Sequence, residues 1–205
     1  MSSARDRARP NIAIGRGEHL CAIYLNHRER DDVLLPYLQD GLARGDKCLV
    51  AISEADSANL LARIIGDFDV PASVASGQLE VRTLTDPVLQ PGQVATQVAI
   101  AFWDTKVRAA LAEGYTLVRL GAEATWWMPQ MSGIDELIRY ESELNRFVGR
   151  YPQSILCMYE LSQLDGSVVI ELLKVHPRLL FYGMILENPY YLTPDEYFAA
   201  AALEE

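Results

Sequence analysis

Positive charge is scarce in this sequence of 205 residues. It has 18 lysines and arginines against 28 aspartates and glutamates, which gives a net charge of -10 and an isoelectric point near 4.8. A surface that binds nucleic acid needs clustered Lys and Arg to neutralise phosphates. The one basic cluster, at residues 4–10, precedes the first apolar segment. We assign it to a flexible N-terminal arm over residues 1–16 and expect no direct contact with nucleic acid.

Long apolar runs are also absent. No stretch approaches the roughly 18 apolar residues of a transmembrane helix, and the arginine-rich start is not followed by the apolar segment of a secretory signal. Cysteine is rare and odd in number: Cys21, Cys48 and Cys157 each lie in an apolar run. This pattern favours buried, reduced thiols over a disulfide framework. We therefore expect a cytoplasmic protein with no membrane contact.

Glycine is missing where nucleotide-binding α/β proteins need it. A strand-like segment at 19–25 leads into the polar stretch "NHRERDD" and then a helix, with no glycine between Glu18 and Gly41. A phosphate loop needs glycines, so that backbone N–H groups can turn toward the phosphates, and a lysine. This junction has neither. The G-x-S-x-G motif of hydrolases is absent too, so the sequence predicts neither ATPase chemistry nor an enzyme.

What the sequence does contain is a regular alternation of strand-like and helix-like segments. Strands are predicted at 19–25, 47–53, 77–84, 116–127, 154–161 and 178–191. Helices are predicted at 32–45, 55–68, 91–115, 133–152, 166–177 and 193–205. Pro36 fits best in a first helical turn, so the first helix is expected to begin near Asp32 or Val33 and to end at Gly45. The alternation predicts one α/β domain over 17–205, a three-layer sandwich with a mostly parallel central sheet.

The carboxyl ends of the strands form the candidate ligand site, because open α/β sheets bind ligands at that edge. The predicted ends carry aromatic and acidic side chains, among them Tyr24, Glu123, Trp126 and Tyr159. Such groups suit a small organic ligand, since aromatic rings supply apolar contact and a carboxylate fixes a polar group. Trp126 and Trp127 are adjacent, so one of them is expected to face a cleft or a partner.

The first predicted strand is a candidate for metal binding. His19 and Cys21 are two residues apart on it, so their side chains lie on the same face. A His-x-Cys pair can begin a zinc site, but a structural site needs four ligands. The other cysteines and His176 are scattered along the chain, so no metal and no cofactor are predicted, and His176 is expected to be structural. Glu141 and Asn145, four residues apart on one helix, are expected to be solvated or to brace that helix.

Several motifs occur in a fixed order between Gly17 and Tyr191: "GEHLCAIY", "GLARGDKCLV", "GQLEV", "YESELN", "ILCMYE" and "HPRLLFYGMILENPYY". Together they resemble the MEDS domain, the methanogen/methylotroph DcmR sensory domain. The resemblance implies a RecA/KaiC-like fold with a degenerate phosphate loop, and a sensory domain of signalling proteins that binds a small organic ligand such as a hydrocarbon derivative. It also implies that His19 and Cys21 belong to the sensing site.

These observations lead to one principal hypothesis, a stand-alone, non-enzymatic sensory domain. Its expected ligand-binding residues are His19, Cys21, Tyr24, Glu123, Trp126 and Tyr159. If related ATPases guide the strand order, the first, fourth and fifth strands are neighbours, and Tyr24, Glu123 and Tyr159 meet at one rim. The signal would pass to a kinase, an anti-sigma factor or a transcription regulator, and a homodimer is left open.

Two alternatives remain beside it. The first is a degenerate ATPase-like scaffold that acts only as a protein-interaction module in a kinase or anti-sigma pathway. The second is a residual enzyme that uses the thiolate of Cys21, which would require an electropositive, partly exposed setting for that thiol.

Overall fold

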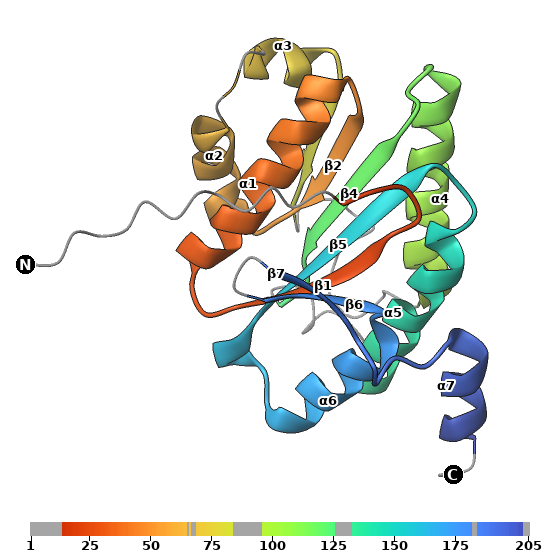
Figure 1. Cartoon of the computed structure of the whole chain (residues 1–205). Coiled ribbons are helices and arrows are strands. Elements are labelled where there is room, and N and C mark those ends of the chain that lie inside the picture. Colours follow the sequence, from red (N-terminus) through yellow and green to blue (C-terminus); the bar gives the residue numbers. More distant parts are fainter. Residues whose placement is uncertain are drawn as a thin grey trace, which may run out of the picture.

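The computed structural model describes residues 14–64, 66, 69–83, 96–125, 133–181 and 184–202. One sheet of seven strands runs through it in the order β3-β2-β4-β5-β1-β6-β7 (Figure 1). The strands are β1 (His19–Tyr24), β2 (Lys47–Ala51), β3 (Leu79–Arg82), β4 (Val118–Glu123), β5 (Gln153–Glu160), β6 (Arg178–Phe181) and β7 (Met184–Glu187). The helices are α1 (His27–Arg44), α2 (Glu54–Arg63), α3 (Val70–Ala75), α4 (Thr96–Ala112), α5 (Ile134–Val148), the 3-10 turn η3 (Leu161–Gln163), α6 (Gly166–Val175) and α7 (Pro194–Ala201).

Helices cover both faces of the sheet, with α1 and α2 on one face and α4, α5 and α6 on the other (Figure 1). Alternate residues of each strand feed the two hydrophobic cores. On β1, Leu20 and Tyr24 pack toward α1, whereas Cys21 packs toward α5. Apart from the antiparallel β6–β7 pair, the strand pairs of the described residues are parallel. The predicted three-layer α/β architecture is confirmed.

Helix α1 begins earlier than predicted, at His27 instead of Asp32 or Val33. The side chain of Asn26 caps it by accepting hydrogen bonds from the backbone N–H groups of Arg28 and Glu29, at 3.1 and 3.2 Å. An N-cap of this kind satisfies donors that the helix itself leaves free. Pro36 therefore lies inside the helix and does not mark its first turn. The predicted end at Gly45 is confirmed, with a left-handed φ of 79°.

The segment 178–191 was predicted as one last strand, and this is wrong. It forms two antiparallel strands, β6 and β7, with Phe181 opposite Met184. Strand β6 pairs with β1 on one side and with β7 on the other, so β7 becomes the edge of the sheet. Gly183, a glycine within a strand pattern, is the sequence signal for such a break.

Other predicted segments agree in kind and differ in length. Helix α5 ends at Val148, four residues before Pro152, and β4 ends at Glu123. Trp126 and Trp127, residues 91–95 and most of the predicted N-terminal arm lie outside the described residues. None of the helices in the described part of the chain combines the length and the apolar character needed to cross a membrane.

Candidate functional site

Two side chains from non-adjacent strands meet at the carboxyl edge of the sheet. Tyr24 ends β1 and Glu123 ends β4, and β5 lies between these strands. The Tyr24 hydroxyl donates a 2.6 Å hydrogen bond to Oε1 of Glu123, and both residues are buried. Burial, and hydrogen bonding to a carboxylate that stabilises the protonated phenol, raise the pKa of Tyr24 far above its usual value. The meeting of these two residues was predicted correctly.

A guanidinium group from the second turn of α1 completes this corner. Nη1 of Arg30 lies 3.3 Å from both carboxylate oxygens of Glu123 and 3.0 Å from Oδ2 of Asp56 on α2. Its Nε donates to Asp31 at 2.9 Å, and Asp31 also pairs with Arg63. We call Tyr24, Arg30, Asp31, Asp56 and Glu123 the Arg30 network.

The electrostatics of the Arg30 network do not suit a polyphosphate. Three carboxylates surround one buried guanidinium, and Arg63, the other cation paired with them, is half exposed. Burial opposes the charge on Asp56, but hydrogen bonds from Ser53 and Arg30 outweigh it and hold the pKa of Asp56 below its usual range. His27, Asp56 and Glu123 are close enough to hold a metal ion, but Arg30 already contacts both carboxylates as their cation.

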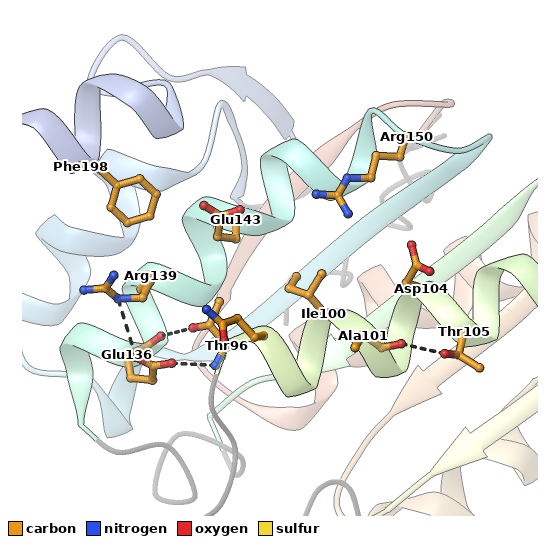
Figure 2. A pocket seen from close by; sticks show the side chains of 11 residues that line it. Thr96, Ile100, Ala101, Asp104, Thr105, Glu136, Arg139, Glu143, Arg150 and Phe198 are labelled. Atoms are coloured by element: carbon orange, nitrogen blue, oxygen red, sulfur yellow. Dashed lines mark hydrogen bonds and ion pairs between the residues drawn. The ribbon is translucent and has the colours of Figure 1, made fainter.

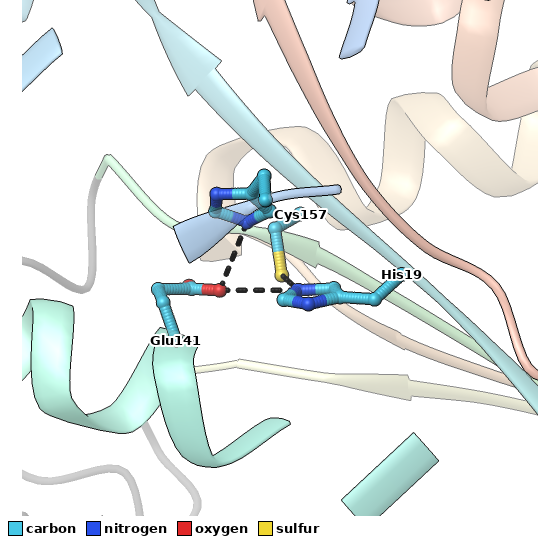
Figure 3. A group of neighbouring side chains, drawn as sticks. His19, Glu141 and Cys157 are labelled. Atoms are coloured by element: carbon cyan, nitrogen blue, oxygen red, sulfur yellow. Dashed lines mark hydrogen bonds and ion pairs between the residues drawn. The ribbon is translucent and has the colours of Figure 1, made fainter. Parts of the chain in front are cut away.

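A second polar cluster lies on the opposite face of the sheet, under α5 and α6. It consists of His19 on β1, Glu141 on α5, Cys157 on β5 and His176 just after α6, and we call it the His19 cluster. Figure 3 shows His19, Glu141 and Cys157 pointing toward one another. All four residues are buried. The prediction that Glu141 is solvated or only braces its helix is wrong, because the residue points inward.

The protonation of the His19 cluster follows from its burial. Desolvation and the neighbouring His176 lower the pKa of His19, so its imidazole is neutral at pH 7. Burial and the charge of Glu141 raise the pKa values of Cys21 and Cys157 well above the usual thiol range. Neither thiol therefore has the electropositive, exposed setting of a reactive thiolate.

The residues predicted to bind a ligand thus divide between the two faces. Tyr24 and Glu123 lie together in the Arg30 network. His19, Cys21 and Tyr159 lie on the α5 face, where the Tyr159 hydroxyl donates to Glu141 at 2.5 Å. Tyr159 therefore does not join Tyr24 and Glu123 at one rim. Trp126 lies outside the described residues.

Sequence reasoning missed Arg30, Asp56 and His176 as parts of a site. Arg30 and Asp56 have no fixed spacing from the strand ends, so no motif marks them. His176 was correctly placed at the end of a helix, but its partners come from three other elements. Glu141 carries a usable signal, because it falls on the same helical stripe as Leu137 and Leu144.

An open groove of about 820 Å³ lies between α4, α5 and α7, and Figure 2 shows its lining side chains. Five of its eleven lining residues are charged, among them Glu136, Arg139, Glu143 and Arg150. No strand contributes to the lining, so the groove is separate from the carboxyl edge of the sheet. Its open shape suits solvent better than a buried organic ligand.

The fold defines the class of protein: a RecA-like α/β fold, in which the two residues Leu25 and Asn26 connect β1 to α1. Residues 18–177 match the model of the MEDS family, the methanogen/methylotroph DcmR sensory domain, and the chain belongs to that family. The resemblance seen in the sequence motifs is confirmed.

Two comparisons extend this assignment. The chain is 26% identical over 188 residues to the transcriptional repressor DcmR of Methylorubrum extorquens, covering 89% of this chain and 68% of DcmR. It is also similar in structure to the flagellar accessory protein FlaH of Methanocaldococcus jannaschii. That similarity has a TM-score of 0.58 at 11% identity and covers 90% of this chain and 82% of FlaH, and it supports the fold alone.

Proposed function

We propose that this chain is a non-enzymatic sensory module that binds a small organic molecule at the carboxyl edge of its sheet. The observation that carries the proposal is the Arg30 network: it occupies the edge where this fold class binds ligands, and its buried guanidinium is already paired with carboxylates. Membership of a sensory-domain family supports the same function. The relationship to a transcriptional repressor supports a role in regulating transcription through a partner protein.

The proposed ligand contacts are Tyr24, Glu123 and Trp126, which follows Glu123 by three residues. Tyr24 and Trp126 would supply aromatic surface, and Glu123 would accept a hydrogen bond from a polar group of the ligand. His19, Cys21 and Tyr159 keep a supporting role in the proposal, because they fix β1 and β5 from the opposite face. Binding would shift the chain between two conformations only if the ligand prefers one of them.

Thermal unfolding of the purified chain in the presence of a panel of small alcohols, amines, halocarbons and aromatic acids tests this proposal. A ligand at one hundred times its Kd adds about 2.7 kcal/mol of stability, so a true ligand raises Tm measurably. The variant Glu123→Gln should lose the response. Glu136→Gln, the same change in the groove between α4 and α5, should keep it. Absence of stabilisation by every compound, or loss of the response in both variants, contradicts the proposal.

A second candidate function is a scaffold that only binds a partner protein, and the edge of the sheet at β6 and β7 favours it. Apolar side chains are exposed there: Phe181 by 39%, Met184 by 58% and Leu186 by 44%. Exposed apolar side chains on an unpaired edge strand are typical of contact surfaces. A partner that binds equally well to Glu123→Gln and to wild type, but not to Met184→Glu, would favour the scaffold over the sensor.

A further inference from the structure

The four ligand atoms of the His19 cluster converge on one small volume. They are Nε2 of His19, a carboxylate oxygen of Glu141, Sγ of Cys157 and Nε2 of His176, and all lie within 4.8 Å of one another. Each residue is at most 2% exposed. The cluster joins β1, near the start of the chain, to α5, β5 and the residue that follows α6.

Hydrogen bonds on the far side of each ring fix the histidine tautomers. Nδ1 of His19 lies 3.0 Å from Oδ1 of Asn145, and the amide of Asn145 is oriented by donating to the carbonyl of Val175 at 2.7 Å. Nδ1 of His176 lies 2.8 Å from the carbonyl of Leu172. Because both partners are acceptors, each Nδ1 carries a hydrogen, and each ring turns its Nε2 toward the cluster.

The carboxylate is arranged in the same way. Oε1 of Glu141 accepts from the Tyr159 hydroxyl, whereas Oε2 faces Nε2 of His19 at 3.2 Å and Nε2 of His176 at 3.1 Å. Neither Oε2 nor Nε2 of His176 has a hydrogen bond of acceptable geometry. Two ring nitrogens, a carboxylate oxygen and the thiol of Cys157 therefore face one another in one buried volume. A buried arrangement of this kind is costly unless a cation lies at its centre.

Three of the six separations match a tetrahedral zinc site, and the other pairs of ligand atoms lie within 4.8 Å of one another. Zinc bonds of about 2.0–2.1 Å to nitrogen and oxygen and about 2.3 Å to sulfur place N and O ligand atoms about 3.3 Å apart, and N and S about 3.6 Å apart. The observed N–O distances are 3.2 and 3.1 Å, and Nε2 of His19 lies 3.5 Å from Sγ of Cys157. With two neutral imidazoles as the other ligands, one carboxylate and one thiolate would also balance the two positive charges of Zn²⁺. The buried site would then carry no net charge.

We propose that His19, Glu141, Cys157 and His176 bind one zinc ion in a closed, structural site that ties β1, β5 and α5 to the end of α6. The thiol of Cys157 gives up its proton to solvent when the metal binds. Asn145 acts as a positioning residue, because it holds the ring of His19 in the required tautomer. This inference is independent of the ligand site proposed above, since the two clusters lie on opposite faces of the sheet.

The first test is the metal content of the full chain purified without chelator, measured by mass spectrometry, with about one zinc per chain expected for a closed four-ligand site. The second test uses protein stripped with a chelator and titrated with Co²⁺ alone. Tetrahedral visible bands and a thiolate-to-cobalt charge-transfer band in the near ultraviolet are expected. If the folded wild type gives neither zinc nor these bands after reconstitution, the proposal is overturned.

Cys21 provides a matched control, because it pairs in register with Cys157, packs into the same core and is equally buried. Cys157→Ser should lose the charge-transfer band and bind zinc at least about tenfold more weakly. Loss of a residue that only supports a ligand already weakens metal affinity by about tenfold or more, so loss of a ligand should cost at least as much. Cys21→Ser should keep both properties. Equal losses in the two variants would overturn the assignment.

The variant Asn145→Ala keeps all four proposed ligands and removes only the residue that orients His19. Circular dichroism checks that this variant is folded. Loss of an outer-sphere partner typically weakens metal affinity by about 10–100-fold, and the charge-transfer band should persist. If Cys157→Ser does not fold, the wild-type cobalt spectrum and Asn145→Ala decide. Unchanged zinc affinity in Asn145→Ala would contradict the positioning role of Asn145. If the wild type also shows no thiolate-to-cobalt band, the metal site itself is contradicted.

Discussion

The hydroxyl of Tyr24, at the end of β1, donates a hydrogen bond to the carboxylate of Glu123, at the end of β4. Strand β5 lies between these two strands, so the bond crosses its end. The bond passes over β5 and connects the ends of β1 and β4 on the α1 face. Arg30 contacts the same carboxylate from the second turn of the helix that follows β1. The corner at which phosphate-loop proteins hold a phosphate is therefore closed by side chains of this chain itself.

We expect Tyr24→Phe to lower the free energy of unfolding by about 1 kcal/mol, because one buried hydrogen bond is lost. Glu123→Gln should cost about 2–3 kcal/mol, because it also removes the charge that faces Arg30. Urea unfolding of both variants and of wild type measures the differences. A Glu123→Gln variant as stable as wild type would show that Arg30 is satisfied by Asp31 and Asp56 alone.

Much of the fold could be predicted from the sequence because its signals are local. Strands that are covered on both faces read as continuous apolar runs, and Gly45 ends α1 where its left-handed conformation was expected. The start of α1 was missed because the capping side chain of Asn26 outweighed the position of Pro36. The division of 178–191 into β6 and β7 was missed because the segment was taken as one apolar run and its Gly183 was not treated as a break.

The candidate sites were less predictable, because their members are brought together only by the topology. His19 and His176 are far apart in sequence and share no spacing motif, so their convergence on Glu141 depends on how β1, α5 and the end of α6 pack. The side-chain alternation of β1 was predictable. Which of its two faces meets α1, and which meets α5, depends on the tertiary structure.

The three cysteines are expected to be unreactive toward thiol reagents in the native protein. Each is at most 2% exposed, and burial raises the pKa of Cys48 to about 12 and those of Cys21 and Cys157 well above the usual range. A thiolate is the reactive species, so a disulfide-exchange reagent at pH 8 should modify the native chain only slowly. All three thiols should react once guanidinium chloride unfolds it.

Peptide mass spectrometry identifies any thiol that is modified early. Rapid labelling of Cys21 in the native state would contradict its buried setting and would support the residual-enzyme hypothesis. Cys21→Ser serves as the control, since it should leave the native labelling rate unchanged and lower the unfolded total by one thiol.

Glu80 is expected to contribute to the acid sensitivity of the fold. Burial opposes its charge, but hydrogen bonds from Lys47 and Arg82 and the charge of Lys47 outweigh burial and lower the pKa of Glu80 to about 2. The pKa in the unfolded chain is about 4.3. Because the folded pKa is the lower one, the stabilisation is fully present above about pH 4.3 and is lost as the pH falls toward 2.

Glu80→Gln should therefore cost about 1–2 kcal/mol at pH 7, after allowance for screening by solvent, and the difference from wild type should shrink below about pH 4.3. Urea unfolding at a series of pH values measures it. Glu113→Gln is a matched control, because Glu113 faces the same Lys47 at 3.9 Å but is 57% exposed, and its loss should cost close to zero. A pH-independent difference for Glu80→Gln would contradict the assignment.

Finally, the chain is expected not to bind Mg²⁺-ATP. A phosphate at the start of α1 would need free backbone N–H groups, but the side chain of Asn26 already accepts from those of Arg28 and Glu29. Asp56 and Glu123 add negative charge at the same corner, and no lysine approaches it among the described residues. Isothermal titration with Mg²⁺-ATP should therefore give no saturable heat.

Asn26→Gly separates the two physical causes. It frees the N–H groups of Arg28 and Glu29 but leaves the carboxylates of Asp56 and Glu123 in place, so it should still not bind the nucleotide. If the electrostatic argument is right, only the removal of the cap together with Glu123→Gln and Asp56→Asn should produce measurable binding. Magnesium-dependent, saturable binding of ATP by the wild-type chain would show that the corner still accepts a triphosphate, and the ligand class proposed here would have to be replaced by nucleotides.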